Sequence, residues 1–94
     1  MSRTYKANIS FTYVDEENLE NETPGSCVIS PKLFEIFFKL CFKECELISH
    51  EQKNKSYDLV FSTSKDFKLL MLEIQVFRFK VQGKMAKVAD IMIN

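Results

Sequence analysis

The chain has 94 residues, of which 46% are hydrophobic, and its 13 basic and 13 acidic residues give a net charge of zero. This length predicts one domain spanning residues 1–94, and the composition excludes a disordered tail and a membrane protein. The balanced charge removes any general electrostatic argument for binding nucleic acid or an anionic membrane.

The ends of the chain and its cysteines predict the compartment. No apolar segment follows the first residues, so we expect no signal peptide. The longest unbroken apolar run, residues 69–72, is far shorter than the ~20 residues of a membrane span. Three cysteines are an odd number, whereas small secreted domains normally pair an even number. We therefore expect free thiols in the cytoplasm.

Two segments are predicted strands. Residues 5–13 alternate apolar and polar side chains, which is typical of a strand with one buried face and one solvated face. Residues 57–63 have a β-rich composition and predict a second, short strand. Between them, residues 15–26 form a predicted acidic loop that ends near the turn dipeptide Pro24-Gly25.

The acidic loop is a candidate docking site. Such charge blocks are usually solvated connections, and the functional alternative is a contact with a basic partner. The spacing does not match a calcium-binding loop. The carboxylates in question are Asp15, Glu16, Glu17, Glu20 and Glu22.

Residues 31–47 predict one long, Phe-rich helix. Ser30 is a good N-cap, and Pro31 suits the first helical position. At about 100° per residue, the polar residues form one narrow stripe, and the apolar arc covers roughly 240°. A helix on one sheet needs an apolar stripe a little over ~100° wide. We therefore expect a homodimer or partner interface at the flanks, through Ile36, Phe38 and Phe42.

The remaining segments are less clear. Residues 51–56 read as a polar connection, and 64–82 permit two structures. As a helix, this segment would be capped by Ser64 and would leave Leu69, Leu72, Val76 and Phe79 on a second face. As a strand over 69–82, it would contain a bulge where the alternation slips, and this structure is favoured. After Gly83, the helical spacing of Met85, Val88 and Met92 favours a short C-terminal helix over a hairpin strand.

No residue set predicts catalysis or a metal site. Cys41 and Cys45 lie one helical turn apart and, with Cys27 and His50, make up a possible zinc-binding set, but only one short ligand pair is present. Neither a nucleophile nor an orienting group can be placed beside His50, the single histidine. We expect no enzyme activity, no metal and no cofactor.

The charge is uneven along the chain and supports a second hypothesis. Residues 1–52 hold five basic and nine acidic residues, and residues 53–94 hold eight and four. A nucleic-acid contact would use the basic residues of the second half. On a strand, however, the aromatic and cationic side chains of residues 77–80 would occupy opposite faces, unlike a platform for single strands. The candidate contacts are Lys53, Lys55, Arg78, Lys80, Lys84 and Lys87.

Together, these patterns predict a small α+β domain with an antiparallel sheet, one long Phe-rich helix and a short C-terminal helix. The leading function is a non-catalytic protein-interaction or regulatory module, self-associating through the Phe-rich helix. Its size and its Lys-, Asn-, Ile- and Phe-rich composition suit a phage or viral accessory protein. The alternative is a small nucleic-acid-binding protein. A small-ligand binder would need a pocket that composition and spacing do not reveal.

Overall fold

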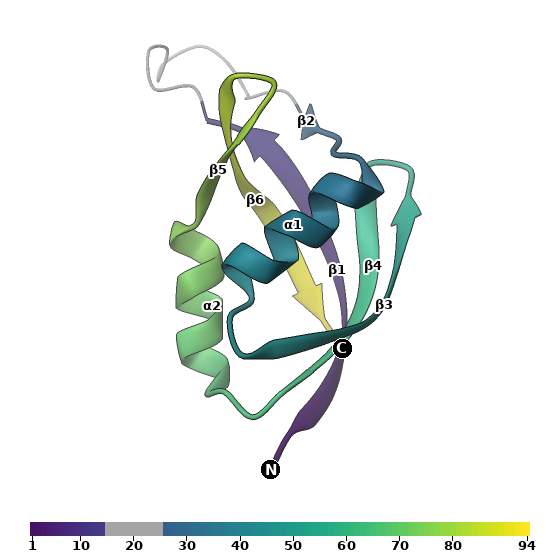
Figure 1. The fold of residues 1–94 in the computed structure, drawn as a ribbon, viewed down its shortest axis with the longest axis vertical. Coiled ribbons are helices and arrows are strands. Elements are labelled where there is room, and N and C mark those ends of the chain that lie inside the picture. The colour runs from purple at the N-terminus through teal and green to yellow at the C-terminus, as the bar shows by residue number, and fades with distance from the viewer. Residues whose placement is uncertain (15–25) are drawn as a thin grey trace.

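The computed structural model describes residues 1–14 and 26–94, which form one mixed α+β unit (Figure 1). Its elements follow in the order β1 (Arg3–Tyr13), β2 (Ser26–Cys27), α1 (Pro31–Cys41), β3 (Cys45–Lys53), β4 (Ser56–Thr63), α2 (Phe67–Val76), β5 (Arg78–Val81) and β6 (Lys84–Ile93).

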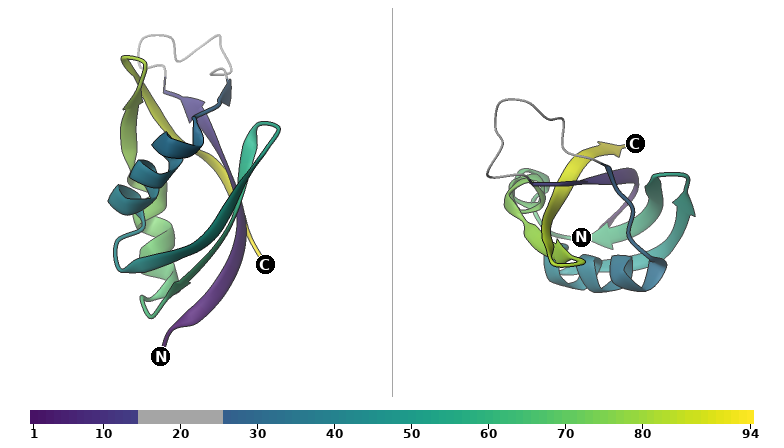
Figure 2. Two further views of the ribbon diagram at one scale, coloured as in Figure 1. Left: turned by 45° about the vertical axis from the view of Figure 1, so that its right-hand side comes forward. Right: turned by 90° about the horizontal axis from the view of Figure 1, so that it is seen from above.

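The strands form a curled antiparallel sheet in the order β3-β4-β1-β6-β5, with β2 paired to the end of β1. Figures 1 and 2 show α1 and α2 on the same face of this sheet. Without β2 and β5, the element order is βαββαβ and the strand order is that of a split βαβ arrangement. The predicted α+β class and antiparallel sheet are therefore confirmed. This arrangement carries no functional assignment, because one fold supports many functions.

The core lies between the sheet and the helices, and phenylalanine dominates it. Ala7, Ile9 and Phe11 are buried, as the alternation in β1 predicted. The Phe11 ring lies edge-on to Phe37, with the two ring centroids 4.9 Å apart. Such edge-to-face contacts add roughly 0.5–1.5 kcal/mol beyond the burial of area. The other buried phenylalanines are Phe34, Phe38, Phe42 and Phe61.

The predicted long helix over 31–47 is wrong, because α1 ends at Cys41. Ser30 caps its start as expected, through a bond from the Leu33 amide to the Ser30 hydroxyl oxygen. At the other end, Phe42 leaves the helical conformation, and Glu44 takes a positive φ of 66°. The chain then reverses into β3, which pairs with β4 along its length. This hairpin pairing outweighs the local helical pattern, and it includes part of the predicted 51–56 connection.

The favoured strand over 69–82 is also wrong in its first half. Residues 67–76 form α2, and the predicted helix cap is displaced from Ser64 to Asp66, whose carboxylate accepts a bond from the Leu69 amide. The second half, β5, is a strand as expected. The slip in the alternation near residue 76 therefore marks a boundary between helix and strand rather than a β-bulge.

The predicted C-terminal helix is wrong as well. Residues 84–93 form β6, which lies between β1 and β5. The helical spacing of its apolar residues is overridden by hydrogen bonding to a strand on each side. The hairpin turn before it uses positive φ angles at Gln82 (52°) and Gly83 (78°), which suits the right-handed twist of the two strands.

Candidate protein-interaction surface

Exposed apolar side chains of the described residues concentrate on the two helices. On α1, Ile36 and Leu40 are 47% and 54% exposed. On α2, the exposed fractions are 49% for Leu69, 58% for Leu72 and 70% for Val76. Single exposed apolar residues are normal, but a contiguous group commonly marks an interaction site. The positions of these five residues on their helices therefore decide whether they form one surface.

The apolar stripe of α1 borders the side that faces α2 and β5. Residues three and four positions apart share a helix face, so half-buried Leu33 aligns with Ile36 and Leu40. By the same spacing, Leu33 and Leu40 both neighbour Phe37. The Phe37 ring centroid is 5.7 Å from that of Phe77, directly after α2. The Phe37 ring centroid is also 5.2 Å from that of Phe79, so the stripe lies on the side of α1 that faces β5 and the end of α2.

The apolar stripe of α2 faces away from the buried residues Leu70 and Ile74, and one of its two edges borders α1. Leu69 and Val76 are four and three positions from Glu73, so all three share one side of the helix. The carboxylate of Glu73 acts electrostatically on the thiol of Cys41, the last residue of α1. Figures 1 and 2 agree that the end of α1 lies beside α2. Leu72 lies on the other edge of this stripe, where it lines a groove with Val88 and Ile91 of β6. We call the exposed apolar residues of the two helices together the two-helix surface, formed by Leu33, Ile36, Leu40, Leu69, Leu72 and Val76.

The predicted interface residues occupy two different environments. Phe38 and Phe42 are only 3% and 1% exposed, and their rings stack with centroids 4.6 Å apart inside the chain's own core. Ile36 is exposed and belongs to the two-helix surface. Counting residues 42–47 as helix widened the apolar arc only from roughly 200° to roughly 240°, at 100° per residue; the arc is wide because one of its edges, at Phe38, is buried and the other, at Ile36, is exposed. The α2 stripe was missed, although the helical alternative for 64–82 placed Leu69, Leu72 and Val76 on a second face.

The charges beside the two-helix surface are mainly unpaired lysines. Within the described part of the chain, Lys32, Lys39 and Lys68 form no ion pair. Of the two acidic residues on the helices, Glu73 pairs with Lys65, whereas the exposed Glu35 lies 3.8 Å from the Nε2 atom of His50. Glu35 is also one helical turn from both Lys32 and Lys39. The border of the surface is therefore mixed in charge on α1 and basic at Lys68 on α2.

A polar junction holds α2 against the start of β3. The Lys65 side chain is 7% exposed, bonds to the Lys43 carbonyl and pairs with Glu73, and this pairing raises the Lys65 pKa. Burial, reinforced by the Glu73 carboxylate, raises the pKa of Cys41 to about 12. Burial also raises the pKa of Cys45. Both thiols are therefore protonated at neutral pH, which makes them poor nucleophiles and poor metal ligands.

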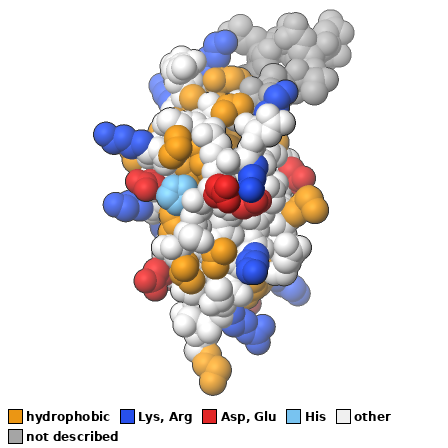
Figure 3. Space-filling model, turned by 90° about the vertical axis from the view of Figure 1, so that its right-hand side faces the viewer, with side chains coloured by type: hydrophobic (Ala, Val, Ile, Leu, Met, Phe, Trp, Pro, Cys, Tyr) orange, Lys and Arg blue, Asp and Glu red, His pale blue; other side chains and the backbone are white. Residues whose placement is uncertain are grey.

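The four residues considered for zinc are not brought together as a site. Across residues 1–14 and 26–94, no group of three or more His, Cys, Asp or Glu side chains is placed to hold a metal ion. His50 instead packs on Phe34, with ring centroids 5.3 Å apart. Figure 3 shows this histidine in pale blue, on a side of the molecule where basic and acidic side chains are interspersed.

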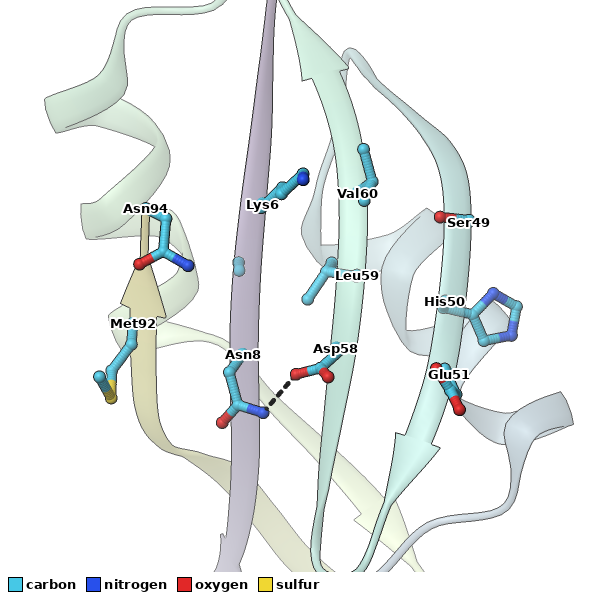
Figure 4. Close-up of a pocket in the computed structure, with 11 residues that line it drawn as sticks. Lys6, Asn8, Ser49, His50, Glu51, Asp58, Leu59, Val60, Met92 and Asn94 are labelled. Atoms are coloured by element: carbon cyan, nitrogen blue, oxygen red, sulfur yellow. Dashed lines mark hydrogen bonds between the residues drawn. The ribbon is translucent and has the colours of Figure 1, made fainter.

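A polar groove crosses the sheet face opposite the helices (Figure 4). There the Asn8 side chain donates hydrogen bonds to Asp58 (2.8 Å) and to Ser56 (2.9 Å). The groove is open to solvent, and its central carboxylate is already paired with an amide. Nothing in this arrangement activates a nucleophile or shields an acid–base group.

The predicted nucleic-acid contacts are divided between opposite edges of the sheet. Lys53 and Lys55 lie at the β3–β4 hairpin, whereas the other four lie on the β5–β6 hairpin. Arg78 and Lys87 are cross-strand partners there. Sheets that bind RNA stack bases on aromatic side chains of their open face. The outer faces of β1 and β4 carry none, since their outward residues are polar or aliphatic.

The predicted docking loop, Asp15 to Glu22, lies outside the described residues. Among the described helices, none is long and apolar enough to cross a membrane. Comparison with known proteins adds no relative: no protein-family model, no curated protein and no solved structure matches this chain.

Proposed function

We propose that this protein is a non-catalytic protein-interaction module that binds its partner through the two-helix surface. The observation that carries the proposal is the exposure of five large apolar side chains, 47–70% exposed, on the two helices that cover one face of the sheet (Figure 1). Leaving such side chains in water is unfavourable, and covering the part of each one that is still exposed contributes roughly 1–2 kcal/mol. A partner that covers both stripes gains most of this energy.

The chemistry of the potentially reactive side chains supports a binding role. The Cys41 thiol is buried, and its pKa of about 12 keeps it protonated. The His50 ring is stacked on Phe34 and lies near Glu35, where no hydroxyl or thiol nucleophile is paired with it in the described residues. These groups stabilise structure and do not form a reaction centre.

The proposal is tested with paired surface variants. Leu40→Asp with Leu72→Asp places one charge on each stripe. Ile48→Asp with Met92→Asp is the matched control, because these residues are 55% and 62% exposed and lie on the sheet. Circular dichroism should show that both variants remain folded, since surface substitutions usually cost little stability. Light scattering then gives the mass of each form relative to the 11.0 kDa chain.

Two results support the proposal. In the first, the wild type is a dimer, and only the Leu40→Asp and Leu72→Asp variant (the helix variant) is a monomer. In the second, the wild type is a monomer and binds a protein from a lysate of the source cells in a pull-down. In the second case the retained protein is purified, and its affinity should fall at least about tenfold for the helix variant alone. If the helix variant and the control variant have the same mass and the same affinity for the purified protein, the proposal is contradicted.

A further inference from the structure

We propose that the groove between α2 and β6 binds an extended, apolar peptide segment of a partner protein, which pairs with the open edge of β6 as an added strand. This site goes beyond the proposed function. It shares only Leu72 with the two-helix surface, so either proposal can fail without the other. Two features of the described residues carry it: the unpaired backbone edge of β6 and the apolar side chains beside that edge.

The edge of β6 that faces away from β1 is paired over only the first part of the strand. β5 pairs with residues 84–87 of β6, and its pairing ends at Arg78. The chain before Arg78 belongs to α2, which lies beyond the end of β5 in Figure 1. Residues 88–93 therefore have β1 on one side and, within the described part of the chain, no strand on the other.

The ladder with β1 fixes which backbone groups point out of this edge. The Asn94 amide donates a 2.9 Å hydrogen bond to the Lys6 carbonyl. Hydrogen-bonded positions alternate in an antiparallel ladder, so Met92 also bonds to β1, whereas the N–H and C=O groups of Ile91 and Ile93 point toward the open edge. Such a row of unpaired backbone groups is a template for a strand of another chain.

Apolar side chains line a groove of about 580 Å³ directly beside this edge. Its two charged lining residues, Lys68 and Asp90, have opposite signs, so the groove favours an apolar occupant over a charged one. Alternate side chains of an added strand would point into the groove, because successive residues of a strand face opposite ways. A peptide with apolar residues at every second position therefore fits both the edge and the groove. The large apolar residues of the groove are Phe67, Met71, Leu72, Ile74, Val88 and Ile91.

The opposite edge of the sheet differs from this one in charge. The edge strand β3 carries Glu46, Glu51 and Lys53, and charged side chains are a common protection of edge strands against pairing with other chains. The open stretch of β6 carries one charge, at Asp90, and neither proline nor lysine. Its ladder with β1 is regular over residues 90–93. Of the two edges, β6 is therefore the one that is suited to pairing.

The size of the site suits a peptide better than a second copy of this chain. Ten residues line the groove, whereas each partner in a stable protein pair contributes roughly 20–30. In a symmetric pair joined edge to edge through β6, the α2 helices of both copies would lie beside the same two strands. A peptide brings no such helix to the groove and needs only a short edge.

The test uses displayed linear peptides of about six random residues, the usual length of a strand. Sorting against the wild-type protein should enrich apolar residues at alternate positions. Leu72→Asp places a charge in the groove and should weaken binding of the enriched peptides about tenfold. The matched controls are Leu69→Asp and Leu40→Asp, because these residues are 49% and 54% exposed, belong to the two-helix surface and do not line the groove. Both controls should bind the peptides like the wild type, and circular dichroism checks that all three variants are folded.

Two measurements on the backbone test the added strand itself. In the free protein, the Ile91 amide should exchange with solvent faster than the bonded Met92 amide. A saturating peptide should slow exchange at Ile91 at least about tenfold, because that amide gains a hydrogen bond. In the peptide, N-methylation of one alternate set of residues should remove binding, and N-methylation of the other set should not, since only every second N–H group faces β6.

The remaining outcomes would overturn the proposal. No enriched peptide, or equal effects of Leu72→Asp and Leu69→Asp, would show that the groove is not the binding site. Peptides that require Leu72 but leave exchange at Ile91 unchanged and tolerate both N-methylated sets would exclude the added strand. A dimeric wild type in which the Ile91 amide is protected without peptide would place a second copy at this edge.

Discussion

The hydroxyl group of Tyr57 donates a 2.6 Å hydrogen bond to the backbone carbonyl of Ile29. This bond joins the start of β4, beside its hairpin turn with β3, to the segment directly before α1. The Tyr57 ring also stacks on Phe34, with centroids 4.2 Å apart, so the same side chain fixes both the entry to the helix and its first turn. The orientation of α1 over the sheet, and hence of its exposed stripe, depends on this contact.

We predict that Tyr57→Phe destabilises the protein by about 1–2 kcal/mol, because the buried Ile29 carbonyl loses its shortest hydrogen bond. Urea unfolding followed by circular dichroism measures the change. Tyr5→Phe is the matched control, since the half-buried Tyr5 ring packs on Phe61 and its hydroxyl has no hydrogen-bond partner among the described residues. Equal effects of the two substitutions would show that the Tyr57 hydroxyl bond contributes nothing.

We predict that Glu44→Gly stabilises the protein by roughly 0.5–1 kcal/mol. Glu44 has a φ of 66°, a left-handed conformation that costs a non-glycine residue about 1–2 kcal/mol. Glycine adopts it freely, although its greater freedom in the unfolded chain offsets part of the gain. Glu44→Val should lower the melting temperature, because a β-branched side chain resists this conformation. A Val variant as stable as the wild type would contradict this account of the end of α1.

We predict that Phe38→Asp with Phe42→Asp abolishes folding. Both side chains are almost fully buried, and an unpaired charge there costs more than the ~5–15 kcal/mol that stabilise a typical domain when the lost packing is included. Ile36→Asp on the exposed stripe should retain the wild-type circular dichroism spectrum. A folded double variant of lower mass would instead restore Phe38 and Phe42 as an intermolecular interface.

We predict that stability decreases from about pH 9 toward pH 12, partly through Cys41. Burial raises the pKa of this thiol from its ordinary 9.0 to about 12, so the unfolded chain loses the thiol proton at a lower pH than the folded protein does. The stabilising contribution is therefore complete below pH 9 and is lost as the pH rises through 12. In urea unfolding between pH 8 and 11, Cys41→Ala should show a shallower decline than the wild type. Parallel curves would contradict this role, because the other titrating groups are common to both proteins.

The sequence by itself determined the features that depend on local periodicity. Alternation in residues 5–13 predicted β1 and its buried Ala7, Ile9 and Phe11, because successive strand residues point to opposite faces. The Ser30-Pro31 pair predicted the start of α1, since capping involves only neighbouring residues. Residues 57–63 and the break at Gly83 were predicted for similar local reasons.

Only the tertiary structure decided where elements end and which apolar faces stay exposed. Residues 45–53 and 84–93 are strands because neighbouring strands supply hydrogen-bond partners: β4 and β5 across short hairpin turns, and β1 from the opposite end of the sequence. The helical spacing of residues 45–47 and 84–93 could not reveal those partners. In the same way, the apolar residues of α1 and α2 divide between core and surface according to which side the sheet covers. A periodic pattern defines the sides of a helix, but packing determines which side is buried.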